Sequence, residues 1–391
     1  MQSLPKRLLS IDVLRALTMF LMIFVNDVSG VKHIPEWIDH APGNADAMGF
    51  ADTIFPAFLF ILGLSLPFAI NNRIKKGESS SNILVYILTR SVALLVMGFY
   101  HVNLENYNSA AAIIPKAAWA LIITVAFFLI WLDYPETMKK AGKYTLMGLG
   151  IALLIAMAVI YKGGKGDHIT WMHTSWWGIL GVIGWSYLVC ACVYLMCKGR
   201  LSILIVALLI FAGINIAAHT GILTERLWVI GDASAITLTM GGIVISRLYA
   251  EWVERGKARL IPVVFTTTGI LLIAAGLLIR PYADGISKIR STPAWVFICE
   301  GITILLFQLF IYIVDMRGRK DFLKAIRPAG TSTLTCYLMP YFQVFLMELF
   351  GLKFPYLLSN GAGGLLRSFA VSFIQRWIVG LMEIKHLRLK I

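Results

Sequence analysis

The chain has 391 residues, of which 58% are hydrophobic and 14% are charged, and its formal net charge at pH 7 is +14. Its mean hydropathy of +0.77 excludes a water-soluble globular domain, and its apolar runs repeatedly reach the roughly 20 residues that cross the hydrocarbon core of a bilayer. In such a protein the positive charge gathers in loops and attracts anionic lipid, so it does not indicate nucleic-acid binding.

Hydropathy predicts an all-α, polytopic integral membrane protein with about twelve transmembrane helices. The loops on the side of the N-terminus hold more than twice as many Lys and Arg residues as the loops on the other side. Because basic loops stay in the cytoplasm, we expect cytoplasmic N- and C-termini and an outer loop after the first span. Residues 1–391 are expected to form a single transmembrane domain. The predicted spans are 11–28, 50–70, 83–102, 112–132, 144–161, 175–197, 201–219, 233–253, 260–279, 294–314, 331–351 and 363–384.

The first predicted span carries polar residues at both ends. Asp12 and Arg15 lie about one turn apart near the cytoplasmic end, where a structural ion pair is the simplest expectation. Asn26 and Asp27 lie at the outer end. A carboxamide both donates and accepts hydrogen bonds, so Asn26 is suited to hold a substrate or to stabilise an oxyanion.

A polar loop with two histidines, His33 and His40, joins the first and second spans. An imidazole has an ordinary pKa of about 6.5 and accepts a proton near neutral pH, which makes a loop histidine a candidate general base. We favour His40, and we expect Asp52 at the start of the second span to contact its ring and fix the tautomer. Asp39 is expected to point elsewhere. The simpler alternative is a solvated histidine and a helix-terminal Asp52 favoured by the dipole.

Fewer functional residues stand out farther along the chain. Arg90 and Glu300 lie inside predicted spans, where an ionisable side chain is costly unless it is paired or functional. Residues 112–161 are predicted to form an inserted helical hairpin. The five cysteines lie in apolar runs without metal-ligand spacing, so no metal site is predicted.

Three stretches at the start of the chain resemble a known family. They are Arg7-Leu-Leu-Ser-Ile-Asp12-Val-Leu-Arg15, Met22-Ile-Phe-Val-Asn26-Asp27, and the segment from Trp37 through His40 and Asp52 to Gly63, which contains Phe55-Pro-Ala-Phe-Leu-Phe60. Together they resemble the transmembrane acetyltransferase family of heparan-α-glucosaminide N-acetyltransferase and its bacterial relatives of the DUF5009 type. The similarity is strong over the first three spans and patchy beyond them. Gly181, Val182 and Pro340 stand where the family has other residues.

The resemblance implies a core of about ten helices, to which the 112–161 hairpin is added. It also implies that an acetyl group passes from cytosolic acetyl-coenzyme A to an amino sugar or glycan at the outer face of a bacterial cytoplasmic (inner) membrane. Asn26 and His40 match the family's catalytic residues, and Asp52 joins them as the partner of His40. We therefore expect His40 to act as the general base.

The resemblance also implies roles for residues outside this group. Arg90 resembles the family's Arg-Ser entry to its third helix and is a candidate contact for the coenzyme A diphosphate. Asp12 and Arg15 are further candidates on the coenzyme side. Candidates for acceptor contacts are Asp27, Asp39 and Glu300. A basic cluster before the eleventh span is expected to contact lipid, with coenzyme A phosphates as the alternative; it consists of Arg317, Arg319, Lys320, Lys324 and Arg327.

The main alternative function is a twelve-helix permease for an amino sugar. A permease of that kind is expected to show internal repeats between its halves, and the sequence contains no convincing repeat. The grouping of Asn26, His40 and Asp52 at one membrane face favours an enzyme. The expected partners are an amino sugar or glycan acceptor and membrane lipid, without nucleic acid, and a homodimer is left open.

Overall fold

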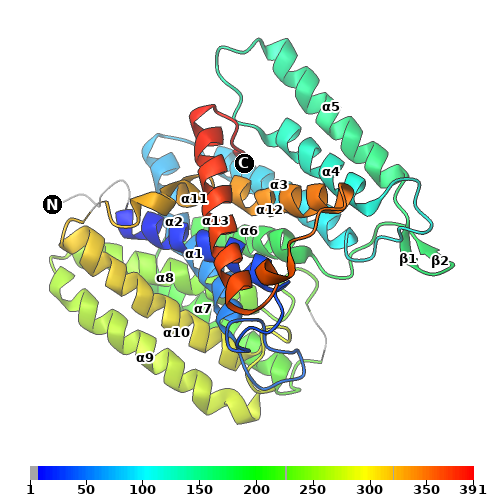
Figure 1. Ribbon diagram of the computed structural model, residues 1–391. Helices are drawn as coiled ribbons and strands as arrows, with labels where there is room; N and C mark the ends of the chain where they lie inside the picture. The colour runs from blue at the N-terminus through cyan, green and yellow to red at the C-terminus, as the bar shows by residue number, and fades with distance from the viewer. Residues whose placement is uncertain (1–7, 225–226, 320) are drawn as a thin grey trace.

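The computed structural model describes residues 8–224, 227–319 and 321–391. Arg7 of the first motif and Lys320 of the basic cluster lie outside these residues. The described residues form a bundle of helices with one small hairpin of strands, so the all-α class is confirmed (Figure 1). The hairpin consists of β1 (Gly163–Lys165) and β2 (His168–Thr170), which pair antiparallel.

Each predicted span corresponds to a helix of the structure, and the short α11 is an additional element. The helices are α1 (Leu9–Val28), α2 (Ile54–Lys75), α3 (Ser80–Asn103), α4 (Lys116–Trp131), α5 (Lys140–Val159), α6 (Gly178–Met196), α7 (Leu201–His219), α8 (Ser234–Glu254), α9 (Ile261–Ile279), α10 (Pro293–Phe310), α11 (Arg327–Thr331), α12 (Thr333–Leu349) and α13 (Gly361–Ile384).

Nine of the helices in the described residues are long and apolar enough to cross a membrane, as judged by length and composition. The chain is therefore an integral, multi-pass membrane protein. The other three long helices fall outside this group for visible reasons. Helix α4 has 16 residues and α12 has 17, while α8 carries Arg247, Glu251 and Glu254 near its end. Twelve crossings and cytoplasmic termini stay predictions.

The hairpin predicted at 112–161 is formed by α4 and α5, which pack on each other at the edge of the bundle (Figure 1). Helix α4 begins at Lys116 rather than at residue 112, with Pro115 as its N-cap. A proline has no backbone N–H to donate, so it is tolerated at the start of a helix but interrupts a longer one. Helix α5 is largely exposed, as expected of a helix that faces lipid.

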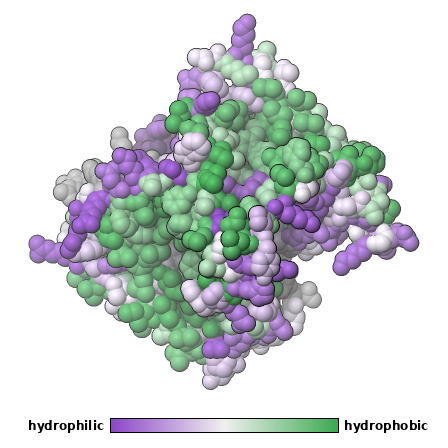
Figure 2. Space-filling model, in the orientation of Figure 1, coloured by the Kyte–Doolittle hydropathy of each residue, from purple (hydrophilic) through white to green (hydrophobic). Residues whose placement is uncertain are grey.

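Hydrophobic side chains cover broad areas of the outer surface. Figure 2 shows them over α9 and α10, and α9 exposes Val263, Ile270, Leu271 and Leu278. An apolar surface of this extent is costly in water and favourable in hydrocarbon. The arrangement agrees with a membrane-embedded bundle.

Helices α2 and α8 cross with their backbones in direct contact. A Cβ atom added to Gly63 of α2 would lie 1.9 Å from the carbonyl oxygen of Thr239. A Cβ atom added to Gly242 of α8 would lie 2.0 Å from the carbonyl oxygen of Phe60. Only glycine leaves room for this approach, which is how small residues let membrane helices pack closely.

Candidate active site

The loop between α1 and α2 folds back onto the short 3₁₀ turn Phe50–Thr53 that leads into α2. The N–H groups of Phe50 and Ala51 donate hydrogen bonds to the carbonyl oxygens of Trp37 (2.7 Å) and Ile38 (3.2 Å). At Gly49 a Cβ atom would lie 1.9 Å from the Asp39 carbonyl oxygen, so the two loop segments meet backbone to backbone. This contact places residue 40 beside residue 52.

The His40 ring and the Asp52 carboxylate form the centre of the site. Nδ1 of His40 lies 2.6 Å from Oδ1 of Asp52, and the Asp52 side chain is 1% exposed whereas that of His40 is 30% exposed. The other Asp52 oxygen, Oδ2, accepts the N–H groups of Ala41 and Gly49, each at 3.0 Å. An ionised carboxylate can only accept, so Nδ1 of His40 carries the proton and Nε2 is left to accept one.

Helix α10 holds the Asp52 backbone from behind. The indole Nε1 of Trp295 donates to the Asp52 carbonyl oxygen at 3.0 Å, and the Cys299 Sγ lies 4.0 Å from the same oxygen. Both side chains are buried. The carboxylate is thus fixed by contacts to its side chain and to its main chain, which favours one orientation of the His40 ring.

Lys288, in the loop before α10, is a third member of the site. Its Nζ lies 3.2 Å from Nδ1 and 3.5 Å from Nε2 of His40, and 3.9 Å from Oδ1 of Asp52. Burial lowers the pKa of the Lys288 ammonium from its ordinary value, while the Asp52 carboxylate opposes that shift. The site therefore combines an imidazole, a buried carboxylate and an ammonium group.

The role of Lys288 at this site was not predicted from the sequence. The residue lies 248 positions from His40, and no local pattern joins them. The sequence before Thr292-Pro-Ala-Trp295 therefore gave no signal for this contact.

Further contacts fasten the Lys288 loop to the His40 loop. Asp46 accepts hydrogen bonds from Nε of Arg280 at 2.9 and 3.0 Å and from the N–H of Ile286 at 2.6 Å. The Ile286 N–H, together with the Arg280 guanidinium, holds the pKa of Asp46 below its ordinary value. The Arg290 guanidinium donates to the carbonyl oxygen of Ala45 at 3.2 Å. These contacts hold the loop that carries His40 and the loop that carries Lys288 together, and the two loops are called the His40 platform below.

The remaining candidates at the His40 end of the bundle differ in their surroundings. Asn26 is exposed on the last turn of α1, and Val25 beside it packs in one apolar cluster with Ala51 and Ile54, so Asn26 lies at the same end of the bundle as Asp52. No hydrogen bond among the described residues joins its side chain to His40. Asp39 accepts the His40 N–H at 2.7 Å through Oδ1.

Asp27 is held by α13 rather than directed to the His40 ring. Its Oδ2 accepts hydrogen bonds from Nε and Nη2 of Arg367 at 3.1 and 2.8 Å and from the Ser368 hydroxyl at 2.6 Å. Asp27 and Arg367 are 13% and 9% exposed. A nearly buried ion pair, in which two guanidinium N–H groups donate to one carboxylate oxygen, fixes α1 against α13.

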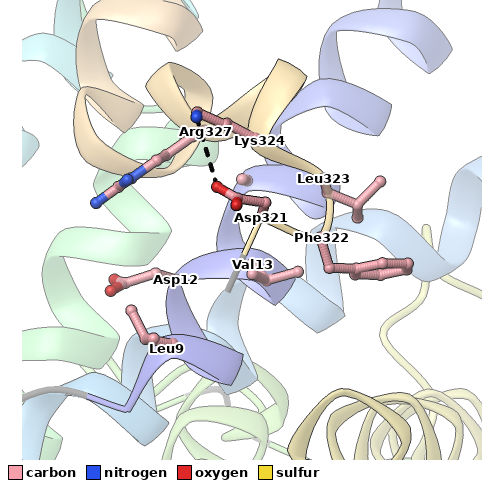
Figure 3. A pocket seen from close by; sticks show the side chains of 9 residues that line it. Leu9, Asp12, Val13, Asp321, Phe322, Leu323, Lys324 and Arg327 are labelled. Carbon is pink, nitrogen blue, oxygen red and sulfur yellow. Dashed lines mark ion pairs between the residues drawn. The ribbon is translucent and has the colours of Figure 1, made fainter. Parts of the chain in front are cut away.

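The opposite end of α1 borders a cavity of about 180 Å³. Figure 3 shows Asp12 on one side of it and Arg327 and Lys324 of the basic cluster on another, with Lys324 paired to Asp321 at 3.5 Å. Arg15 contacts Asp12 at 3.2 Å and also donates to the Ser65 hydroxyl and the Gly330 carbonyl oxygen. The expected Asp12–Arg15 ion pair is therefore present in the structure.

Arg90 lines a second cavity, of about 210 Å³, on the other side of α11. Its Nη1 donates to the Tyr86 hydroxyl at 3.0 Å, and its guanidinium lies 5.1 Å from the centre of the Tyr187 ring. Lys390 and Thr331 line the same cavity, and Met22, Phe58 and Leu62 form part of its apolar wall. Met22 is one turn from Asn26 on α1, so this cavity extends toward the His40 end.

Glu300 lies in the interior of the bundle, on α10. It is 4% exposed and faces α8, where a Cβ atom on Gly241 would lie 1.4 Å from its Oε1. Its neighbour Cys299 reaches the Asp52 carbonyl, whereas Glu300 is directed toward α8. Within the described residues no group of three or more His, Cys, Asp or Glu side chains is placed to hold a metal ion.

Comparison with known proteins agrees with the resemblance noted in the sequence. The family described as a domain of unknown function (DUF5009) matches residues 7–236. Human heparan-alpha-glucosaminide N-acetyltransferase is 36% identical over 107 residues, which are 27% of this chain and 15% of that protein. The mouse protein of the same name is 34% identical over 106 residues, again 27% of this chain and 15% of the relative. The aligned part is thus a small share of both relatives.

Proposed function

The chain belongs to the DUF5009 family, and from this premise we propose that it is a membrane-embedded acetyltransferase. It moves the acetyl group of cytosolic acetyl-coenzyme A to the amine of an amino sugar or glycan at the outer face of a bacterial inner membrane. The observation that carries the proposal is the contact of His40 with the buried Asp52 carboxylate, with Lys288 beside both. The partial similarity to an N-acetyltransferase supports the type of reaction.

In the proposed reaction the acceptor amine attacks the thioester carbonyl carbon. His40 Nε2 accepts the amine proton, because Nδ1 already donates to Asp52. A C–N bond forms, the C–S bond breaks, and the proton leaves with the coenzyme A thiol. Positioned acid-base catalysis of this kind contributes roughly two to four orders of magnitude in rate.

The tetrahedral intermediate carries a negative oxygen that needs a positive or hydrogen-bonding partner. The Lys288 ammonium, 3.5 Å from His40 Nε2, is suited to this role. Asn26 at the outer end of α1 would add a carboxamide donor once the acceptor is bound. Asp39 supports the loop through the His40 N–H.

On the donor side, the two cavities beside α11 are suited to different parts of coenzyme A. The smaller one offers Arg327 and Lys324 to phosphate groups. The other combines Arg90 and Lys390 with apolar side chains that face the acyl arm. This assignment requires a chain with cytoplasmic termini, twelve crossings and the His40 loop outside, as the positive-inside rule predicts.

Acetyl transfer from radiolabelled acetyl-coenzyme A to glucosamine-ended acceptors, by purified protein in detergent or vesicles, tests the proposal. We expect labelled product with the wild type and a loss of about two to four orders of magnitude in turnover with His40→Ala. His33→Ala is the matched control, because His33 lies in the same loop but contacts Asn360. Near-normal transfer by folded His40→Ala protein would remove the histidine from catalysis. Absence of product from every acceptor, with donor binding intact, would contradict the acetyltransferase itself.

A further inference from the structure

A large aromatic cleft lies at the outer ends of α6 and α8, beside the His40 platform. Its volume is about 580 Å³. Four tryptophans line it: Trp176, Trp177, Trp185 and Trp228. The rings of Trp177 and Trp185 are 5.4 Å apart and nearly perpendicular, and Trp228 lies 6.1 Å from Trp185. Trp228 is 82% exposed, so one face of the group is open to a ligand.

Polar groups line the same cleft. Asp232 accepts from the N–H and the hydroxyl of Ser234 at 3.0 and 2.6 Å, both through Oδ1. The indole Nε1 of Trp185 is buried and has no hydrogen-bond partner among the described residues. Tryptophans that only anchor a helix at the membrane interface do not need to converge on such groups.

This combination fits a saccharide. A pyranose ring presents an apolar C–H face, which packs on an indole, and hydroxyl groups at its edge, which donate and accept hydrogen bonds. The carboxylate of Asp232 and the hydroxyl of Ser234, which both line the cleft, offer hydrogen-bonding groups for such hydroxyl groups. The cleft therefore has the two surfaces that a sugar ring requires.

One short segment separates the cleft from the candidate active site. Lys288 contacts His40, whereas Ile289 and Ser291 line the cleft. Ile289 also packs on the His40 loop, where a Cβ atom on Gly43 would lie 3.1 Å from its Cγ2. A chain of sugars crossing this segment would reach both places.

We propose that the tryptophan cleft binds the inner sugars of an oligosaccharide acceptor whose terminal amino sugar is presented to His40. The inference rests on the proposed function and adds to it a second contact site for a glycan acceptor. The cleft would then determine which chains are acetylated, and His40 would determine the chemistry.

Two acceptors, glucosamine and its β-1,4-linked trimer, distinguish the cleft from the reacting site. In Trp228→Ala the KM for the trimer should rise about three- to tenfold, which is the effect of losing one aromatic contact. The KM for glucosamine should not change. Trp171→Ala is the matched control, because Trp171 is also an exposed tryptophan (63%) but does not line the cleft. Equal effects of Trp228→Ala and Trp171→Ala on the trimer would identify both as interfacial anchors and overturn the proposal.

A binding measurement separates this inference from the acetyltransferase proposal. Calorimetric titration of the trimer into His40→Ala protein should show binding, and the further change Trp228→Ala should weaken it about three- to tenfold. That result supports the cleft even if no acceptor is ever acetylated. Unchanged trimer affinity in the double variant would overturn the cleft as a sugar site, whatever the activity assay shows.

Discussion

Replacing Asp52 by asparagine puts an amide NH₂ group in place of one carboxylate oxygen. Its effect follows from the three hydrogen bonds that the carboxylate accepts. One oxygen of the carboxylate accepts a hydrogen bond from His40 Nδ1, and the other accepts hydrogen bonds from two backbone N–H groups. An amide has only one oxygen. If it faces Ala41 and Gly49, the NH₂ group faces His40, and Nδ1 must then become an acceptor.

The energies decide which orientation the asparagine adopts. Turning the amide oxygen to His40 would leave the two backbone N–H groups facing an NH₂ group, at a cost of about 1–3 kcal/mol for each unsatisfied donor. Keeping the backbone bonds and shifting the imidazole proton to Nε2 avoids this cost. Asp52→Asn should therefore fold normally but hold His40 in the tautomer that cannot accept the amine proton. We expect turnover to fall by about two to four orders of magnitude.

Initial rates with labelled acetyl-coenzyme A and glucosamine measure this loss, and thermal unfolding in the same detergent reports the fold. Asp39→Asn is the control. Oδ1 of Asp39 accepts one backbone N–H, which an amide oxygen accepts equally well, so its turnover should stay near that of the wild type. An Asp52→Asn variant with wild-type turnover would refute the assignment of the tautomer and of His40 as the base.

Three further predictions concern charge and topology. Because burial lowers the pKa of Lys288, its ammonium is lost at a lower pH than that of an ordinary lysine. The rate should therefore fall on the alkaline side below about pH 10.4, and Lys288→Arg should move that fall to higher pH; identical alkaline profiles would exclude the ammonium from catalysis. Cysteine introduced at Ser29 should react with an impermeant thiol reagent in intact cells, because the loop after α1 is predicted to lie outside. Labelling only after lysis would contradict this predicted orientation. Arg90→Ala should weaken coenzyme A binding in equilibrium titrations by about tenfold, the effect of losing one charge-assisted contact, and unchanged affinity would remove Arg90 from the donor site.

The helices could be predicted because membrane spans depend on composition over about 20 residues, which the sequence states directly. The predicted helix ends were less accurate where a single residue sets the boundary, as Pro115 does at the start of α4. The pairing of His40 with Asp52 was expected because the two residues border the same loop. The catalytic roles stay predictions.

Contacts between distant segments could not be predicted. Lys288 reaches His40 through the packing of two distant loops, which contacts such as that of Asp46 with Arg280, 234 residues apart, hold together. Likewise Asp27, expected near the acceptor, is paired with Arg367 of the last helix. Such partners follow from how the bundle packs, and a single sequence contains no local pattern for that packing.

The close crossing of α2 and α8 at their glycines bears on the length of acceptor that the proposed function would favour. Asp52, which contacts His40, precedes α2, and Ser234, which lines the tryptophan cleft, begins α8; the backbones of these two helices touch at Gly63 and Gly242. Their close packing sets the distance between His40 and the tryptophan cleft. A larger side chain at either glycine would alter the spacing between the two places, and the preferred chain length of the acceptor would shift although neither glycine touches it.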